Sequence, residues 1–314
     1  MAAGALLVAV VAIVAVAAVS AGGGSGSGNA TQASRGAPGT GKRSGTASHA
    51  GARRPAGQGA TQASASDRGT GRPGDATAPI LMYHVINPPP PSAPFPGLYV
   101  PADEFAAQME ALKAAGWHAV TMDQLEANWT RGVPLPAKPV VLTFDNGYES
   151  QYTNALPVLR RLGWVGVENI QLTGLPPSQG GLTDAQVRGL ISAGWELDTQ
   201  GMSHADLITL DPAGLQYQIA NARQILRSRY GVPVNWFCYP SGHYDANVIA
   251  AVRAAGFVGS TTVVPGWASR GNDSYRLPRL RVLGGTSPTA LLAQISSSES
   301  SSTPPPSYGG SGTS

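Results

Sequence analysis

Acidic, amide and histidine side chains follow several apolar runs of this sequence, where they could hold a metal ion or move protons. Asp145 and Asn146 come directly after the apolar run 140–144 and precede Gly147. In parallel α/β folds the carboxyl ends of the strands carry the chemistry, so an acid at such a point is a candidate catalytic residue. The alternative is a simple tight turn, because Asp, Asn and Gly favour turns for backbone reasons alone.

Other strand-like runs end in the same way. His84 follows the run 79–83, and His204 comes shortly after the run 195–199. Side chains alternate along a strand, so three polar residues of the second run share one face: Glu196, Asp198 and Gln200. With His243, three of the four histidines between residues 79 and 295 fall at the ends of predicted strands. One parallel sheet would bring these residues together at one edge.

Strands and helices alternate in the order that such a sheet requires. Apolar residues recur at helical spacing from Asp103 to Ala115 and from Asp211 to Arg229. Thr121-x-x-Gln124 and Thr183-x-x-Gln186 are capping-box patterns that start two further helices. Strands are predicted at 79–86, 118–121, 139–144, 165–172, 195–199, 234–239, 257–262 and 280–282. About seven or eight such units predict an α/β fold, a closed or distorted barrel of parallel strands over residues 79–295.

The segments outside residues 79–295 predict export and tethering. Residues 1–21 are almost wholly apolar, about long enough to span a bilayer, and end in small residues that suit signal-peptidase cleavage. We expect a signal peptide or an N-terminal membrane anchor, and hence an extracellular or cell-envelope protein. Residues 22–78 form a Gly/Ser/Ala/Arg-rich linker and residues 296–314 a Ser/Pro/Gly-rich tail. We expect both to be disordered, because they contain too few apolar residues to offset the entropy of ordering.

Charge and cysteine content exclude some classes of function. The chain has a net charge of +3, but residues 22–78 hold seven Lys and Arg against two Asp, which leaves residues 79–295 near neutral. Nucleic acid is therefore not an expected partner of the folded part. Cys238 is the single cysteine, so a disulfide within the chain and a thiolate-rich zinc site are excluded. The patterns GxGxxG after the first strand and GxxxxGK[ST] are absent, which removes the usual signals of nucleotide binding.

Five motifs between about residues 80 and 283 resemble, in order, those of the polysaccharide deacetylases, the NodB homology domain of carbohydrate esterase family four. They are PILMYHV at 79–85, VVLTFDNGY at 140–148, SHADL at 203–207, FCYPSGHYD at 237–245 and LPRLRV at 277–282. The pattern is most similar to the exported branch that acts on poly-N-acetylglucosamine. The resemblance implies a distorted (β/α)7 barrel, an N-acetylated polysaccharide as substrate, and a divalent metal such as zinc as cofactor.

The resemblance also assigns roles to individual residues. Asp145 falls on the general base of the family. The three metal positions correspond to Asn146, Gln200 and His204. Two residues are candidates for stabilising the transition state, His84 at the end of the first strand and Tyr239 in the groove motif. The substrate-binding candidates lie in that motif and in the later arginine segment: Tyr239, Pro240, Ser241, Gly242, His243 and Arg279. The family's late histidine, which acts as general acid, has no counterpart, because residues 286–295 contain no histidine.

Two of the three metal positions carry neutral amides, Asn146 and Gln200. Zinc prefers carboxylate, imidazole or thiolate ligands, so we expect a site that is weak or vacant. Asp198, on the same strand face as Gln200, could replace a missing ligand. Three interpretations stay open: a working deacetylase with a rearranged site, a pseudoenzyme that binds glycan without turnover, and a metal-free hydrolase that uses Asp145 and a histidine.

Overall fold

The structure is a computed structural model, and it describes residues 69–175, 180–299 and 303–310. All of them belong to the compact unit Ala60–Ser314. The predicted signal peptide or anchor at 1–21 and almost all of the predicted linker lie outside the described residues. Within the described ranges, no helix has the length and hydropathy needed to cross a bilayer.

The strands of the described part form one sheet that curls into a distorted barrel. The sheet order is β7-β6-β5-β4-β3-β1-β8, with β2 added beside β3 and β9 beside β1. All pairs are parallel except β1 with β8, which run antiparallel. The strands are β1 Thr77–Tyr83, β2 His118–Val120, β3 Pro139–Asn146, β4 Val167–Gln171, β5 Glu196–Gly201, β6 Trp236–Cys238, β7 Gly259–Thr261, β8 Trp267–Ser269 and β9 Leu280–Arg281. The predicted α/β barrel is confirmed.

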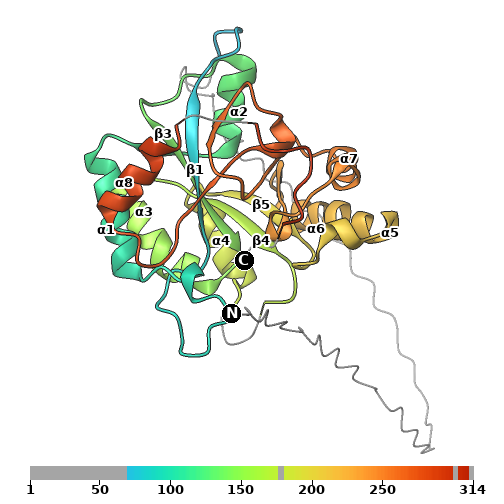
Figure 1. The fold of residues 1–314 in the computed structure, drawn as a ribbon, viewed down its shortest axis with the longest axis horizontal. Coiled ribbons are helices and arrows are strands. Elements are labelled where there is room, and N and C mark those ends of the chain that lie inside the picture. The colour runs from blue at the N-terminus through green and yellow to red at the C-terminus, as the bar shows by residue number, and fades with distance from the viewer. Residues whose placement is uncertain (1–68, 176–179, 300–302, 311–314) are drawn as a thin grey trace, which may run out of the picture. The chain divides into compact units, whose positions relative to one another are not determined.

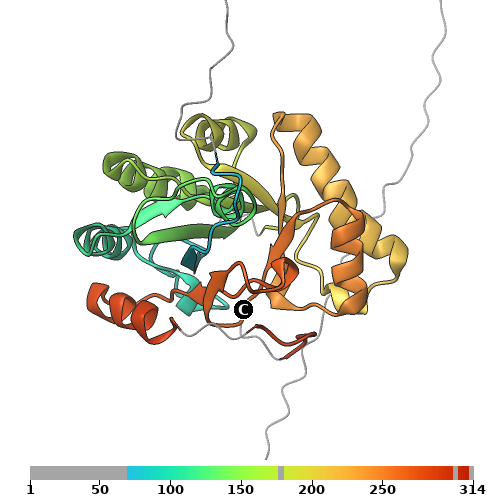
Figure 2. The same cartoon turned by 90° about the horizontal axis from the view of Figure 1, so that it is seen from above.

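Helices cover the outside of the sheet in two groups (Figure 1, Figure 2). Helices α1, α3 and α8 gather beside β1 and β3, whereas α5, α6 and α7 gather beside β5 and β6. The helices are α1 Ala102–Ala114, α2 Met122–Arg131, α3 Leu156–Leu162, α4 Asp184–Ser192, α5 Pro212–Leu215, α6 Ala222–Tyr230, α7 Ala246–Ala254 and α8 Pro288–Ser297. Both predicted capping boxes are present, at Thr121 and at Thr183. Each such cap stabilises its helix by about 1 kcal/mol.

An irregular segment around residues 277–281, which we call the closing segment, completes the barrel between β7 and β1. The Leu277 N–H donates to the Ser260 carbonyl, and the Thr262 N–H donates to the Leu277 carbonyl. A few residues later β9 pairs with β1, where Leu280 lies opposite Leu81. The segment therefore crosses from one edge of the sheet to the other, and it carries Arg279 into the barrel between these two attachments.

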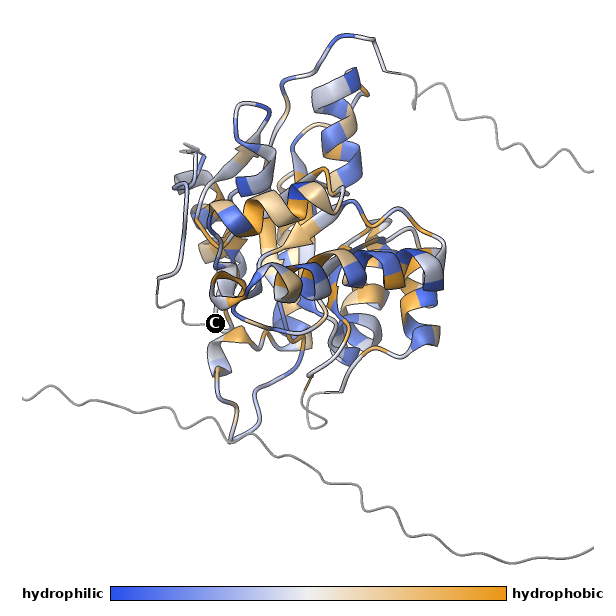
Figure 3. Cartoon of the chain, turned by 90° about the vertical axis from the view of Figure 1, so that its right-hand side faces the viewer, coloured by the Kyte–Doolittle hydropathy of each residue, from blue (hydrophilic) through white to orange (hydrophobic). Residues whose placement is uncertain are grey.

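Strand alternation separates the barrel interior from the layer under the helices. On β3, Val141 packs inside the barrel with Ile80 and Trp236, whereas Phe144 faces outward. The Phe144 ring lies 4.8 Å from the Trp195 ring, centroid to centroid, and 5.9 Å from that of Phe105 on α1. In Figure 3 the hydrophobic colour is concentrated in the central strands. Each large apolar side chain buried in this way contributes about 1.5–3 kcal/mol.

The structure departs from the sequence prediction in three places. The helix predicted from Asp211 to Arg229 is interrupted by a π-helical turn, Gln216–Asn221, between α5 and α6. Strand β8 was not predicted, because three residues followed by a turn give no clear periodicity. Residues 303–310, predicted to be disordered, instead lie against the fold through a β-bridge between Tyr244 and Tyr308.

Candidate active site at the strand ends

Asp145 lies inside the barrel, one residue before the end of β3, and is 1% exposed. The chain turns sharply directly after it, because Asn146 and Gly147 have φ of 78° and 89°. Asn tolerates this left-handed region better than most residues, and glycine adopts it freely. Gly147 also lacks space for a side chain, since a Cβ there would lie 2.8 Å from Ile170 Cγ1. The tight turn that was the alternative interpretation of this stretch is therefore present. It follows the buried Asp145 directly, so the turn and the candidate catalytic acid are compatible.

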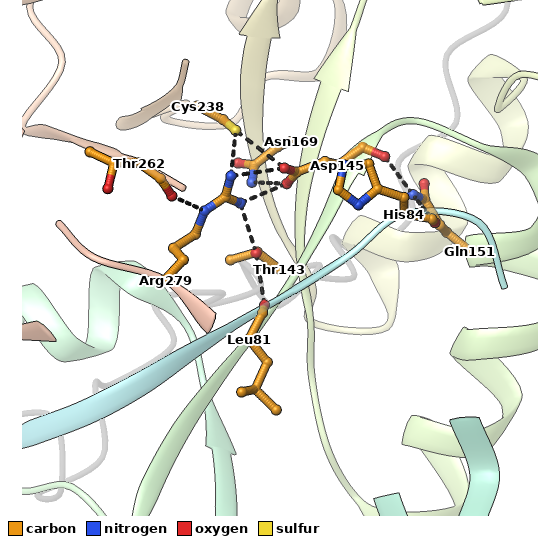
Figure 4. Close-up of polar contacts among 9 residues, drawn as sticks. All are labelled: Leu81, His84, Thr143, Asp145, Gln151, Asn169, Cys238, Thr262 and Arg279. Carbon is orange, nitrogen blue, oxygen red and sulfur yellow. Dashed lines mark hydrogen bonds and ion pairs between the residues drawn. The ribbon is translucent and has the colours of Figure 1, made fainter. Parts of the chain in front are cut away.

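Arg279 binds the Asp145 carboxylate from the closing segment (Figure 4). Its Nη1 donates to Asp145 Oδ1 and its Nη2 to Oδ2, both at 2.9 Å. The remaining donors reach the Thr262 carbonyl at 2.8 Å, Thr143 Oγ1 at 3.1 Å and Cys238 Sγ at 3.2 Å. A guanidinium has five N–H groups, and these contacts use all of them. Arg279 therefore positions the base and has no donor left for the substrate, which corrects its prediction as a substrate-binding residue.

Two further side chains complete the surroundings of this carboxylate. Asn169 Nδ2 donates to Asp145 Oδ1 at 2.9 Å, and the Cys238 thiol donates to Oδ2 at 3.4 Å. Burial alone would raise the pKa of Asp145, but Arg279, His84 and the hydrogen bonds from Arg279 and Asn169 outweigh it and lower the pKa to about 2. Asp145 is therefore a carboxylate throughout the physiological pH range.

His84 follows β1 and is 7% exposed. Gln151 Nε2 donates to the His84 carbonyl at 2.9 Å and to the Asp145 carbonyl at 2.8 Å, so it ties the ends of β1 and β3 together. Burial lowers the pKa of His84 to about 4, although Asp145 acts in the opposite direction. The imidazole is thus neutral at pH 7. Its Nδ1 has no hydrogen-bond partner among the described residues.

The residues predicted to occupy the three metal positions do not form a metal site of the expected kind. Asn146 Nδ2 donates to Gln171 Oε1 at 2.7 Å, and Gln171 Nε2 donates to the Thr173 carbonyl at 2.7 Å. Gln200 is buried, and its Oε1 has no partner in the described part of the chain. His204 lies exposed in the loop after β5. Two neutral amides and one histidine do not fit zinc, which prefers anionic or imidazole ligands.

Acidic side chains from elsewhere do not complete this set. No group of three or more His, Cys, Asp and Glu within residues 69–175, 180–299 and 303–310 could hold a metal ion. Asp198, the predicted substitute ligand, lies further down β5, where its Oδ1 accepts from the Trp236 N–H at 2.8 Å. Burial raises the pKa of Asp198 above its ordinary value, and the hydrogen bond from the Trp236 N–H opposes this. The described position of Asp198 suits a structural role.

The groove motif is more deeply buried than its predicted role requires. The Tyr239 side chain is 1% exposed, and its hydroxyl donates to the Tyr275 carbonyl at 2.9 Å, away from Asp145. Pro240 is also buried, and Ser241 and Gly242 form a turn with φ of 54° and 73°. A Cβ on Gly242 would lie 2.4 Å from Val263 Cγ2, so the turn requires glycine there. The turn directly follows Cys238, the last residue of β6, whose thiol contacts Asp145.

Several residues of the site were missed from the sequence. Asn169, Gln171 and Gln151 carry no motif, and the sequence offered Cys238 only as the single cysteine of the chain. Strand alternation offered a signal for two of them, since Asn169 and Gln171 lie two and four residues beyond Val167 on the interior face of β4. A pocket of about 280 Å³ opens beside Gly147 and Gln171, but Asp145 and His84 do not line it.

Comparison with known proteins identifies the family. Residues 132–260 match the family described as polysaccharide deacetylase. A candidate polysaccharide deacetylase of Bacillus subtilis (strain 168), YxkH, is 30% identical over 223 residues, which cover 71% of this chain and 77% of that protein. The chain belongs to the polysaccharide deacetylase family.

Two further matches fit this membership. A poly-β-1,6-N-acetyl-D-glucosamine N-deacetylase of Escherichia coli (strain K12) is 42% identical over 60 residues, 19% of this chain and 9% of that protein. The structure of the Streptococcus pyogenes deacetylase PplD in complex with acetate superposes with a TM-score of 0.65 and 25% identity. That match covers 70% of this chain and 99% of PplD, so most of the described fold is shared.

Proposed function

We propose that this protein removes acetyl groups from an N-acetylated polysaccharide of the cell wall or an exopolysaccharide, slowly and without a metal held in the family manner. One observation carries the proposal: Asp145 is kept as a carboxylate among the strand ends by four hydrogen bonds, which come from Arg279, Asn169 and Cys238. The name of the Escherichia coli relative supports an N-acetylated glucosamine polymer as the substrate class.

The strand ends offer partners for an acetamido group. Gln200 Oε1 and His84 Nδ1 are buried polar atoms that lack a hydrogen-bond partner within the described ranges. Leaving such an atom unpaired costs about 1–3 kcal/mol, so a ligand that pairs with it is favoured. In the proposed complex the N–H of the substrate acetamide donates to Gln200 Oε1, and the neutral His84 ring lies beside the acetyl group.

Hydrolysis then needs one carboxylate in two roles. The 3.4 Å contact from the Cys238 thiol gives way at Oδ2, and Asp145 accepts a proton there from a water molecule as the water oxygen bonds to the acetyl carbon. The C–N bond then breaks, the same proton passes from Asp145 to the leaving nitrogen, and acetate and a free amine result. No separate acid is required, which agrees with the missing late histidine. The rate should be low, because a carboxyl group with a pKa of about 2 is a weak base and general-base catalysis favours a pKa near the working pH.

Glycan binding without turnover is the second candidate function. Its support is the chemistry of Asn146 and Gln200, which removes the anionic and imidazole ligands on which water activation by a metal depends. The barrel and the wall around the groove motif do not need those ligands, so recognition of the polysaccharide can persist without the reaction.

Acetate release distinguishes the two candidates. The full-length chain is incubated with N-acetylglucosamine oligomers, with and without a chelator, beside Asp145→Asn as the matched control. Slow release that survives the chelator and disappears in Asp145→Asn is expected. Release that the chelator abolishes would refute the metal-free mechanism. Oligomer binding with no release from the wild-type chain would establish the second candidate.

We also propose that the protein works outside the cell or in the cell envelope. The support is the apolar composition of residues 1–21, which suits a signal peptide or a membrane anchor. Cell fractionation, with mass spectrometry of the mature N-terminus, tests this. Recovery of the unprocessed chain only from the cytoplasm would contradict it.

A further inference from the structure

The described C-terminal residues 303–310 form a strap across the loops that follow β5 and β6. The Tyr244 N–H donates to the Tyr308 carbonyl and the Tyr308 N–H to the Tyr244 carbonyl, both at 2.8 Å. The Tyr244 hydroxyl donates to the Pro305 carbonyl at 2.8 Å. Pro304 is buried, although its neighbours in the strap are exposed. These reciprocal backbone hydrogen bonds indicate a specific contact between the C-terminal residues and the barrel.

Side chains of the barrel hold the strap at both of its ends. Arg276 Nη1 donates to the Pro304 carbonyl at 3.0 Å. At the other end His243 Nε2 lies 2.8 Å from the Gly310 carbonyl oxygen, and its Nδ1 lies 3.0 Å from Asp206 Oδ1. His243 belongs to the groove motif and Asp206 follows His204 by two residues. The strap is therefore anchored on the loop after β6 and on Arg276, and His243 links it to Asp206 in the loop after β5.

Tyr308 brings the strap to the edge of the candidate active site. It is half-buried, and its ring centroid lies 6.3 Å from that of His243. Its phenol is near enough to Arg281 to interact with that guanidinium electrostatically, and Arg281 interacts in the same way with His84. Arg281 lies two residues after Arg279, on the same face of the closing segment. A partly open aromatic ring thus lies near the His243 imidazole and within electrostatic range of Arg281, which in turn is within electrostatic range of His84.

This combination suits a sugar ring. A pyranose presents an apolar C–H face that packs on an aromatic ring, and hydroxyl groups at its rim that exchange hydrogen bonds with polar side chains. We propose that the strap 303–310 forms one wall of the glycan groove, and that Tyr308 contacts the sugar next to the one whose acetamido group enters the strand ends. The inference rests on the proposed function, because it assumes an N-acetylated polysaccharide in that groove.

The strap then favours a polymer over a single sugar. A monosaccharide fills only the strand ends and does not reach Tyr308, whereas an oligomer reaches both. The hydrogen bonds of the strap go to Tyr244, Arg276 and His243, and none of them uses the partnerless atoms of His84 and Gln200.

Calorimetric titration of the full-length chain with N-acetylglucosamine and with its tetramer tests the inference. The variants are Tyr308→Ala, Tyr308→Phe, which keeps the ring, and Tyr217→Ala, a control at an exposed tyrosine of the π-helical turn. Tyr308→Ala should weaken tetramer binding roughly ten-fold and leave monomer binding unchanged, as expected for the loss of one stacking contact. Tyr308→Phe and Tyr217→Ala should bind the tetramer like the wild type.

The possible outcomes separate the two proposals. Unchanged tetramer binding by Tyr308→Ala, or a wild type that binds the tetramer no better than the monomer, would overturn the inference and leave the proposed function standing. Tighter tetramer binding by Tyr308→Ala would show that the strap obstructs the groove, and would also overturn it. A wild-type chain that binds neither ligand would overturn the proposed function itself. Hydrogen exchange at the Tyr244 amide checks that the strap stays docked in each variant, since its pairing uses backbone atoms.

Discussion

Replacing Arg279 with methionine should destabilise the fold strongly, and by an amount that depends on pH. Arg279 and Asp145 are each 1% exposed, so the charges form a buried ion pair with two 2.9 Å hydrogen bonds. Removing one partner of such a pair leaves an uncompensated buried charge, which costs about 3–5 kcal/mol. We expect a loss of that size in the free energy of unfolding of Arg279→Met at pH 7.

The sign of the pH dependence follows from the pKa of Asp145. In the wild type that pKa is about 2, below the ordinary value of about 3.9, so this group contributes stability above pH 4 that is lost as the pH falls. The linkage is worth about 2–3 kcal/mol. In Arg279→Met only His84 and the Asn169 hydrogen bond still oppose burial, so the pKa of Asp145 rises. The variant is therefore least affected below pH 4 and loses stability as the pH rises above it.

Urea unfolding followed by tryptophan fluorescence between pH 4 and pH 8 measures this difference. The matched control is Asp145→Asn combined with Arg279→Met, which removes both charges and should recover much of the lost stability at pH 7. The reasoning is refuted if Arg279→Met unfolds at the wild-type urea concentration at pH 7. It is also refuted if the double variant is no more stable than the single one, because the penalty would then not come from the unpaired carboxylate.

Two further changes are predicted. Glu168 is fully buried, neither of its carboxyl oxygens has a partner within the described ranges, and burial, with a smaller effect of Asp145, raises its pKa well above the ordinary value. Glu168→Gln should therefore stabilise the fold at pH 7 by about 1–3 kcal/mol, with the gain shrinking toward pH 4, and equal urea midpoints at pH 7 would contradict this. Asn146→Asp with Gln200→His should create zinc binding measurable by equilibrium dialysis, and failure of the double variant to bind zinc would show that these are not the metal positions.

Local features of the fold were predictable because their signals are local. The capping boxes at Thr121 and Thr183 are short patterns whose hydrogen bonds form within four residues, and both are present. The position of Asp145 at a strand end followed from the apolar run before it. The π-helical turn Gln216–Asn221 was not visible, since its residues keep the helical spacing on which the prediction relied.

Contacts between distant segments could not be derived in this way. Asp145 and Arg279 are separated by 134 residues, and the hydrogen bonds of the guanidinium depend on how the closing segment crosses the barrel. The prediction that residues 303–310 are disordered was wrong for a related reason. Composition reports only the apolar residues of the segment itself. Pro304 and Tyr308 are instead stabilised by burial against the barrel and by hydrogen bonds to barrel residues.

Asn146 and Gln200, the two amides at the predicted metal positions, share an electrostatic explanation. Asp145 and Arg279 cancel each other's charge, and His84 is neutral, so the centre of the site carries no net charge without a metal. A carboxylate at position 146, which is 5% exposed, would add an unpaired buried charge beside Asp145 unless a cation were bound.

Asn146→Asp alone should for this reason destabilise the metal-free protein by about 1–3 kcal/mol at pH 7. Gln200→His alone should have a smaller effect, because a neutral imidazole adds no charge. Zinc should raise the unfolding temperature of the double variant and leave that of Asn146→Asp nearly unchanged, since binding only to the folded state stabilises it. If Asn146→Asp were as stable as the wild type in the presence of a chelator, the neutral centre would not be the reason that both ligands are amides.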